Sequence, residues 1–126
     1  MKRLLLVIIA SALLFANAPV SASSAEATGI PWVRNSTDAC VWVTVESETG
    51  SFSDPVSSHG ERQFRKPEHA IKVRFEFNDP YLYPHCVRGN YVDTLDEDVP
   101  ASTSTFTVFT LTGRNKNYSV SVSREN

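Results

Sequence analysis

The stretch AIKVRFEFN, residues 70–78, alternates apolar and charged side chains with a period of two. In an extended chain this alternation places Ile71, Val73, Phe75 and Phe77 on one face and the charged residues between them on the other. The pattern predicts a β-strand with one buried face and one solvated face, which is typical of an antiparallel sheet packed on a core.

The stretch ACVWVTVE, residues 39–46, is the strongest further strand signal because it is rich in Val, Trp and Thr. Both of its faces are largely apolar, so we expect it at the centre of a sheet. Pro31 lies within the apolar patch 29–34, and because proline lacks the ladder N–H, that patch is expected as an edge strand. Further strands are predicted at 61–66, 85–92, 102–112 and 118–123, with a short one around Phe52.

No segment after residue 28 shows a sustained helical period, and turn signals recur about every 8–12 residues. Several short strands separated by turns predict an all-β fold. We expect a small antiparallel β-sandwich with immunoglobulin-like or Greek-key connections, and an open β-barrel is the alternative. The chain shows neither an internal repeat nor a shift in composition, so residues 29–126 are expected to form a single domain.

The N-terminus has the layout of a secretory signal peptide. Lys2 and Arg3 precede the apolar run 4–15, which is followed by small residues that end at Ala22. The run is shorter than the roughly 20 residues of a membrane span, so no transmembrane segment is expected in the mature chain. The prediction is a signal peptide over 1–22 that is cleaved, a flexible leader over 23–28, and a secreted or periplasmic protein.

Cys40 and Cys86 are the only two cysteines. In an exported chain a lone pair of this kind is typical of a structural disulfide. Free thiols, or a metal site that includes His85, are the alternatives, although a zinc site usually needs about four ligands in closely spaced pairs.

Charge excludes one class of partner and suggests one cofactor. The net charge is −2, and removal of Lys2 and Arg3 lowers it by two more, so nucleic acid is not expected as a partner. The segment DTLDED at 93–98 is expected as an acidic loop, in which the carboxylates could hold Ca²⁺ or could simply face solvent. Its candidate ligands are Asp93, Asp96, Glu97 and Asp98, and no other cofactor is expected.

Catalysis is not favoured by any motif. The chain contains no Gly-x-Ser-x-Gly, no His-Glu-x-x-His and no glycine-rich phosphate loop, and His59, His69 and His85 are scattered. We therefore expect no catalytic residues, and an enzyme is the less favoured class.

The proline-flanked segment 80–84, PYLYP, is the best candidate binding site. Prolines at both ends restrict the chain, so Tyr81, Leu82 and Tyr83 are expected at a loop tip, where tyrosines make good contact anchors. The alternative is that the tyrosines fold back and cover the end of the sandwich.

These observations favour an exported, non-catalytic β-domain that acts by surface recognition, as a binding, adhesion or inhibitor module. Its partner would be a protein or a glycan at the cell envelope or outside the cell. The first alternative is a membrane-acting, cytolysin-like β-sandwich that contacts lipid through Trp32, Trp42 or residues 81–83. The second alternative is a small secreted hydrolase.

Overall fold

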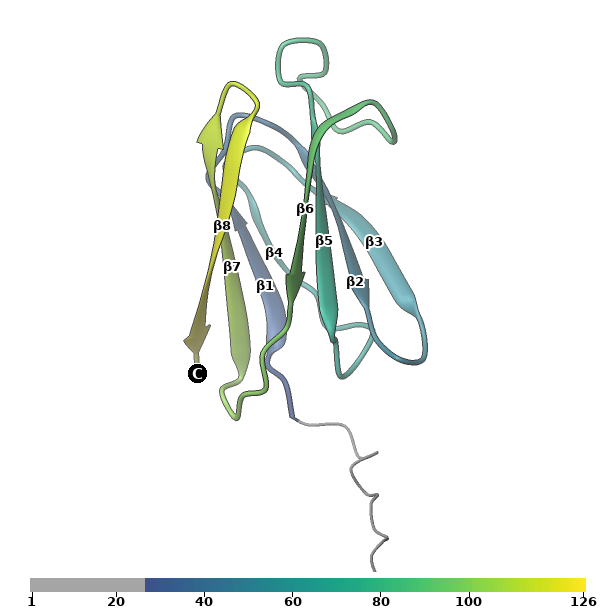
Figure 1. Cartoon of the computed structure of the whole chain (residues 1–126), viewed down its shortest axis with the longest axis vertical. Coiled ribbons are helices and arrows are strands. Elements are labelled where there is room, and N and C mark those ends of the chain that lie inside the picture. Colours follow the sequence, from purple (N-terminus) through teal and green to yellow (C-terminus); the bar gives the residue numbers. More distant parts are fainter. Residues whose placement is uncertain (1–26) are drawn as a thin grey trace, which may run out of the picture.

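The computed structural model describes residues 27–126, so the predicted signal peptide 1–22 and most of the leader 23–28 lie outside the described residues. The described chain is all-β, as predicted (Figure 1). Its first residues are already paired, because Thr28 forms a β-bridge with Ala101. The strands are β1 (Ile30–Asn35), β2 (Val41–Glu46), β3 (Ser51–Val56), β4 (Glu61–Gln63), β5 (Lys72–Asn78), β6 (Tyr91–Asp98), β7 (Phe106–Arg114) and β8 (Asn117–Glu125).

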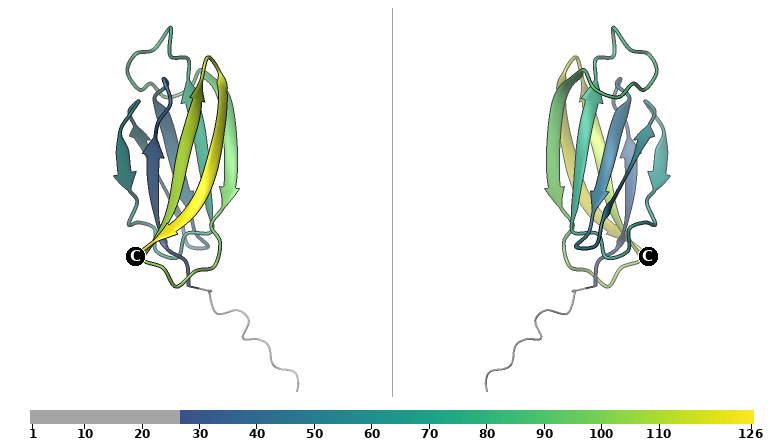
Figure 2. Two further views of the ribbon diagram at one scale, coloured as in Figure 1. Left: turned by 90° about the vertical axis from the view of Figure 1, so that its left-hand side faces the viewer. Right: turned by 90° about the vertical axis from the view of Figure 1, so that its right-hand side faces the viewer.

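Two sheets of four strands pack face to face (Figure 2). One has the order β4-β1-β7-β8 and the other the order β3-β2-β5-β6. The predicted β-sandwich is therefore confirmed, and the open barrel is not formed. The sheets are antiparallel throughout except for the pair β1 and β7, which is parallel.

The core forms between β2 and β5 on one side and the first sheet on the other. β2 pairs with β5 so that Val43 lies opposite Phe75, and both are fully buried. The ring of Phe75 lies 5.7 Å from that of Phe109 on β7, which joins the two sheets. The alternation predicted for residues 70–78 is confirmed within β5, because Val73, Phe75 and Phe77 are buried and Arg74 is exposed. The burial predicted for Ile71 is wrong, because this residue lies before the start of β5 and is 48% exposed.

The edge position predicted for residues 29–34 is wrong. β1 lies inside its sheet, antiparallel to β4 and parallel to β7. Ile30 N–H donates to Thr105 O on the β7 side, so the nitrogen of Pro31 faces the β4 side. On the β4 side the strand pairing ends at Trp32 and Gln63, so no ladder hydrogen bond requires an N–H at Pro31.

Residues 79–90 form a loop, and the strand predicted at 85–92 begins only at Tyr91. Gly89 and Asn90 have φ values of 84° and 56°, which a strand does not accommodate. The predicted acidic loop 93–98 is instead part of strand β6. Its partner β5 places Arg74 opposite Asp96 and Lys72 opposite Asp98, and opposite charges across two strands stabilise the pairing.

β7 and β8 form a hairpin that closes through a two-residue turn. Asn115 and Lys116 have φ values of 58° and 65°, as a type I′ turn requires. Tyr118 is buried and Val120 is half-buried, as the alternation over 118–123 predicts. Val122, expected to face the core, is 39% exposed, because β8 and β6 diverge toward the C-terminal end of β8 (Figures 1 and 2).

Candidate functional site

The loop over residues 79–90 projects beyond the strands at one end of the sandwich (Figure 1). Two of the predicted binding residues lie at its tip, where Tyr81 is 72% exposed and Leu82 is 69% exposed. Tyr83 is half-buried. The three residues therefore lie in one loop, and the first two side chains are presented to solvent, whereas Tyr83, also predicted at the tip, is partly covered.

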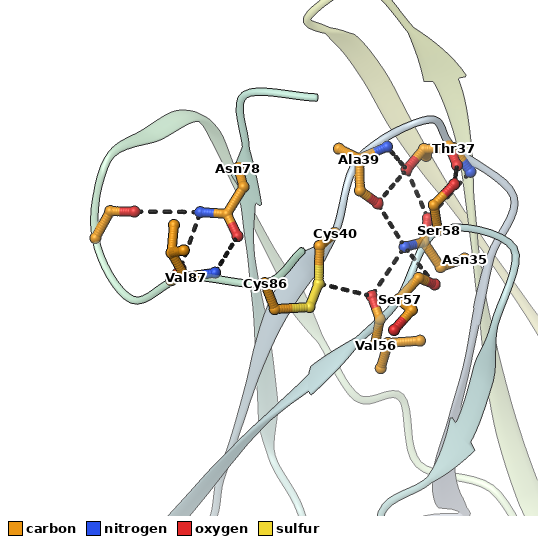
Figure 3. Close-up of a disulfide and its surroundings, with 11 residues drawn as sticks. Asn35, Thr37, Ala39, Cys40, Val56, Ser57, Ser58, Asn78, Cys86 and Val87 are labelled. Atoms are coloured by element: carbon orange, nitrogen blue, oxygen red, sulfur yellow. Dashed lines mark hydrogen bonds between the residues drawn. A yellow bond between two sulfur atoms is a disulfide. The ribbon is translucent and has the colours of Figure 1, made fainter. Parts of the chain in front are cut away.

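Asn78 fixes the base of this loop. Its fully buried side-chain amide donates to Val87 O at 3.0 Å and to Gly89 O at 3.2 Å. Its Oδ1 accepts a hydrogen bond from Val87 N–H at 3.0 Å (Figure 3). One buried side chain thus satisfies three backbone groups of the loop, which an isolated loop would expose to water.

The disulfide between Cys40 and Cys86 is confirmed, and it ties the middle of the loop to the start of β2 (Figure 3). Ala39, which precedes Cys40, is itself held in place. The side chain of buried Asn35 donates to Ala39 O at 2.9 Å and to Val56 O at 3.1 Å. The loop is therefore fastened to a rigid part of the fold on both sides.

Asp79 orders the first turn of the loop and connects it to the β7–β8 hairpin. Tyr81 N–H donates to Asp79 Oδ1 at 2.9 Å, and Lys116 Nζ lies 3.3 Å from Asp79 Oδ2. The hydrogen bond from Tyr81 is the main cause of a lowered pKa at Asp79, and Lys116 adds to the lowering. The hydroxyl of Tyr81 also donates to Asn115 Oδ1, so the loop and the hairpin turn form one surface.

The hairpin turn is anchored by Asp38. Tyr118 Oη donates to Asp38 Oδ1 at 2.8 Å, and Asn115 N–H donates to Oδ2 at 3.1 Å. Burial raises the pKa of Tyr118, and the bond to Asp38 raises it further, so this tyrosine stays neutral.

Asp38 also lines a shallow hollow of about 370 Å³ with His59 and Arg114. Both of its oxygens are engaged in holding the hairpin, so this carboxylate is not placed as a free general base.

Sequence reasoning did not find the contribution of Asn115, Lys116 and Asp38 to this end of the molecule. The sequence GRNKN at 113–117 has hairpin chemistry and indicates the turn itself. Nothing in it indicates that the turn lies beside residues 79–81, because that contact depends on how the two sheets pack.

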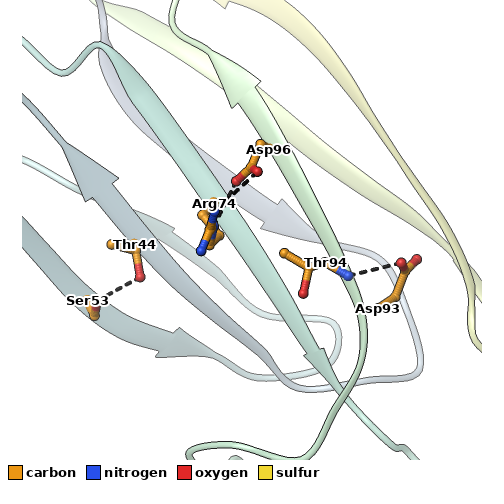
Figure 4. A network of polar contacts seen from close by, with 6 residues as sticks. All are labelled: Thr44, Ser53, Arg74, Asp93, Thr94 and Asp96. Carbon is orange, nitrogen blue, oxygen red and sulfur yellow. Dashed lines mark hydrogen bonds and ion pairs between the residues drawn. The ribbon is translucent and has the colours of Figure 1, made fainter.

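The four predicted calcium ligands lie on β6 and alternate between its two faces. Asp96 pairs with Arg74, with Nε and Oδ1 2.9 Å apart (Figure 4). The hydrogen bond from Arg74 lowers the pKa of Asp96. Asp93 and Glu97 lie on the other face, in line with Phe77 and Val73. No three metal-binding side chains come together within residues 27–126. The calcium hypothesis stays a prediction, but the acidic loop that motivated it is a strand.

Both tryptophans are half-buried beneath an arginine. The guanidinium of Arg34 lies 4.2 Å from the centre of the Trp32 ring, and Trp32 Nε1 donates to Glu61 at 2.7 Å. The guanidinium of Arg88 lies 4.6 Å from the centre of the Trp42 ring. Neither ring has both faces free for a ligand or a lipid, in contrast to the exposed tip of the loop 79–90.

No protein-family model matches the chain, and no curated protein or solved structure is detectably similar to it. Within residues 27–126 there is no helix, and hence none with the length and apolar character needed to cross a bilayer.

Proposed function

We propose that this chain is an exported, non-catalytic β-domain that recognises a protein or a glycan through the loop 79–90. The observation that carries the proposal is the contrast between the tip and the base of the loop. Tyr81 and Leu82 are about seven-tenths exposed, whereas Asn78, Asp79 and the disulfide hold the base to the sandwich.

A contact surface of this kind loses little entropy on binding. Tyrosine offers a large amphipathic ring with few rotatable bonds, and a loop that is already ordered does not have to be ordered by the ligand. The nearby turn residues add an amide and an ammonium group to this surface, because Asn115 bonds to the hydroxyl of Tyr81 and Lys116 lies beside Asp79. A protein surface or a sugar offers both the apolar area and the hydrogen-bonding groups that match them.

A neutral lipid surface is a second candidate, favoured by the same exposed pair. Tyrosine and leucine at a loop tip are side chains suited to the interface of a bilayer, where one end of the tyrosine stays wet. The acidic character of the chain disfavours anionic lipid.

The test compares binding with stability in the same variants. The probes are solubilised envelope proteins, a glycan array and neutral phosphatidylcholine vesicles. Tyr81→Ala and Leu82→Ala should each weaken binding to one probe by roughly 1–2 kcal/mol, the range of a contact anchor. The melting temperature should stay nearly constant, since both side chains are largely exposed.

The matched control is Ile71→Ala, because Ile71 is also exposed, at 48%, and precedes β5, whereas the loop follows it. This change should leave binding intact. Binding to vesicles alone would select the membrane function. If the loop variants lower stability while the folded protein keeps its full affinity, these side chains support the fold and do not contact a partner, and the recognition proposal fails.

A further inference from the structure

The sandwich has four edge strands, and three of them carry features that prevent pairing with another chain. β4 is only three residues long, and β3 contains Pro55. β6 places Asp93 and Glu97 on its core-facing side, and inward-pointing charges of this kind block an added strand. β8 runs for nine residues and has neither proline nor a charged side chain between Asn117 and Ser123.

The register of the sheet shows which backbone groups of β8 are free. Leu111 O accepts a hydrogen bond from Ser36 N–H on the β1 side, so Leu111 turns away from β8. Its cross-strand partner is Val120. In an antiparallel pair such a residue directs its own N–H and C=O outward. By the same alternation, the open edge of β8 presents the backbone of Tyr118, Val120, Val122 and Arg124.

We propose that β8 pairs antiparallel with β8 of a second copy of this chain, about a two-fold axis at Ser121. This register joins outward-directed backbone groups, because Val120 of each copy lies opposite Val122 of the other. The apolar pair covers Val122, which is 39% exposed in the single chain. On the outer face Ser119 lies opposite Ser123, so hydroxyl groups meet hydroxyl groups.

The same register brings opposite charges together at each end. It places Arg124 opposite the second copy's Tyr118. Within one chain the ring of Tyr118 stacks on Phe77 at 4.4 Å, and Phe77 lies opposite Asp93 on β6. The exposed Arg124 of each copy therefore approaches the Asp93 of the other. The two-fold axis makes this ion pair twice, and the acidic edge of β6 attracts a copy of this chain instead of repelling it.

Sedimentation velocity of the purified protein over a range of concentrations tests the proposal. We expect a reversible dimer in the micromolar range, as suits a small edge-to-edge interface. Val122→Lys should raise the dimer dissociation constant about tenfold or more, because two opposed pairs are disturbed at once. The control Ser123→Lys adds the same charge one residue away on the outer face and should change it far less.

Charge reversal supplies the second measurement. Arg124→Glu should weaken the dimer, and its combination with Asp93→Arg should restore it, with circular dichroism confirming that each variant is folded. Added salt should weaken the wild-type dimer, and this dependence on salt should disappear in the variant Arg124→Ala. A wild-type protein that stays monomeric at about 1 mM, near the weak limit of specific association, would overturn the proposal. So would a dimer that Val122→Lys leaves unchanged, or a double charge reversal that gives no recovery.

Discussion

Removal of the Cys40–Cys86 disulfide should lower the free energy of unfolding by about 4 kcal/mol. The two cysteines are separated by 46 positions. Cross-linking a loop of that length removes conformational entropy from the unfolded chain, which gives about 4 kcal/mol in the chain-entropy model. Because small domains have only about 5–15 kcal/mol in total, this single bond supplies a large share.

The assay is urea unfolding of the oxidised protein and of the double variant Cys40→Ala, Cys86→Ala. The denaturant slope should rise in the variant, because its unfolded chain is less compact and exposes more surface. Asn78→Ala in the oxidised protein is the contrasting case. It leaves the bonding groups of Val87 and Gly89 without their partner, at a cost of about 1–3 kcal/mol, but keeps the denaturant slope. A loss below about 1 kcal/mol in the double variant, with no change in slope, would refute the entropic reasoning.

Two further predictions concern the core and the loop. Phe75→Ala should cost about 3–5 kcal/mol, because the ring is fully buried against Phe109. Arg74→Ala should cost less than about 1 kcal/mol, because its ion pair with Asp96 is exposed. If chemical denaturation gives equal losses in the free energy of unfolding for the two variants, the burial of one face of β5 and the exposure of the other are contradicted. Asp79 has a lowered pKa, so its contribution to loop order is complete above the ordinary carboxyl value and is lost as pH falls through the lowered one. Amide signals of residues 79–83, followed by NMR during acidification, should shift in that acidic range, and Asp79→Asn should abolish the dependence. A shift that persists in the variant would show that another group is responsible.

The strands that sequence predicted well are those whose own side chains carry the pattern. Residues 70–78 alternate regularly, and 39–46 are apolar on both faces, so β5 and β2 follow from local chemistry. The disulfide followed from the cysteine count. The flanking prolines indicated a loop tip, which holds for Tyr81 and Leu82, whereas Tyr83 is half-buried.

The predictions that failed depended on partners far away in the chain. Pro31 indicated an edge, yet β1 is accommodated in the sheet because β4 ends before it reaches that nitrogen. Residues 93–98 have the composition of a loop, but the basic residues of β5 allow them to pair as a strand. The contact of Tyr81 with Asn115 joins residues 34 positions apart, and no local pattern reports it.

The place of β1 between β4 and β7 has a consequence for how the protein is made. A chain emerges N-terminus first, so Ile30 is available long before its parallel partner Phe106 has been synthesised. The sheet β3-β2-β5-β6 uses residues 41–98 only and can form earlier. At that stage the other sheet still lacks β7 and β8, the last two strands of the chain. Pairings between such distant segments close slowly, because the entropy of a long loop is lost before the contacts form. We expect that a chain truncated before residue 106 leaves the β7-facing edge of β1 unpaired and Phe75 without its contact with Phe109, so that chaperones or proteases recognise it and the last strands act as a checkpoint for complete synthesis.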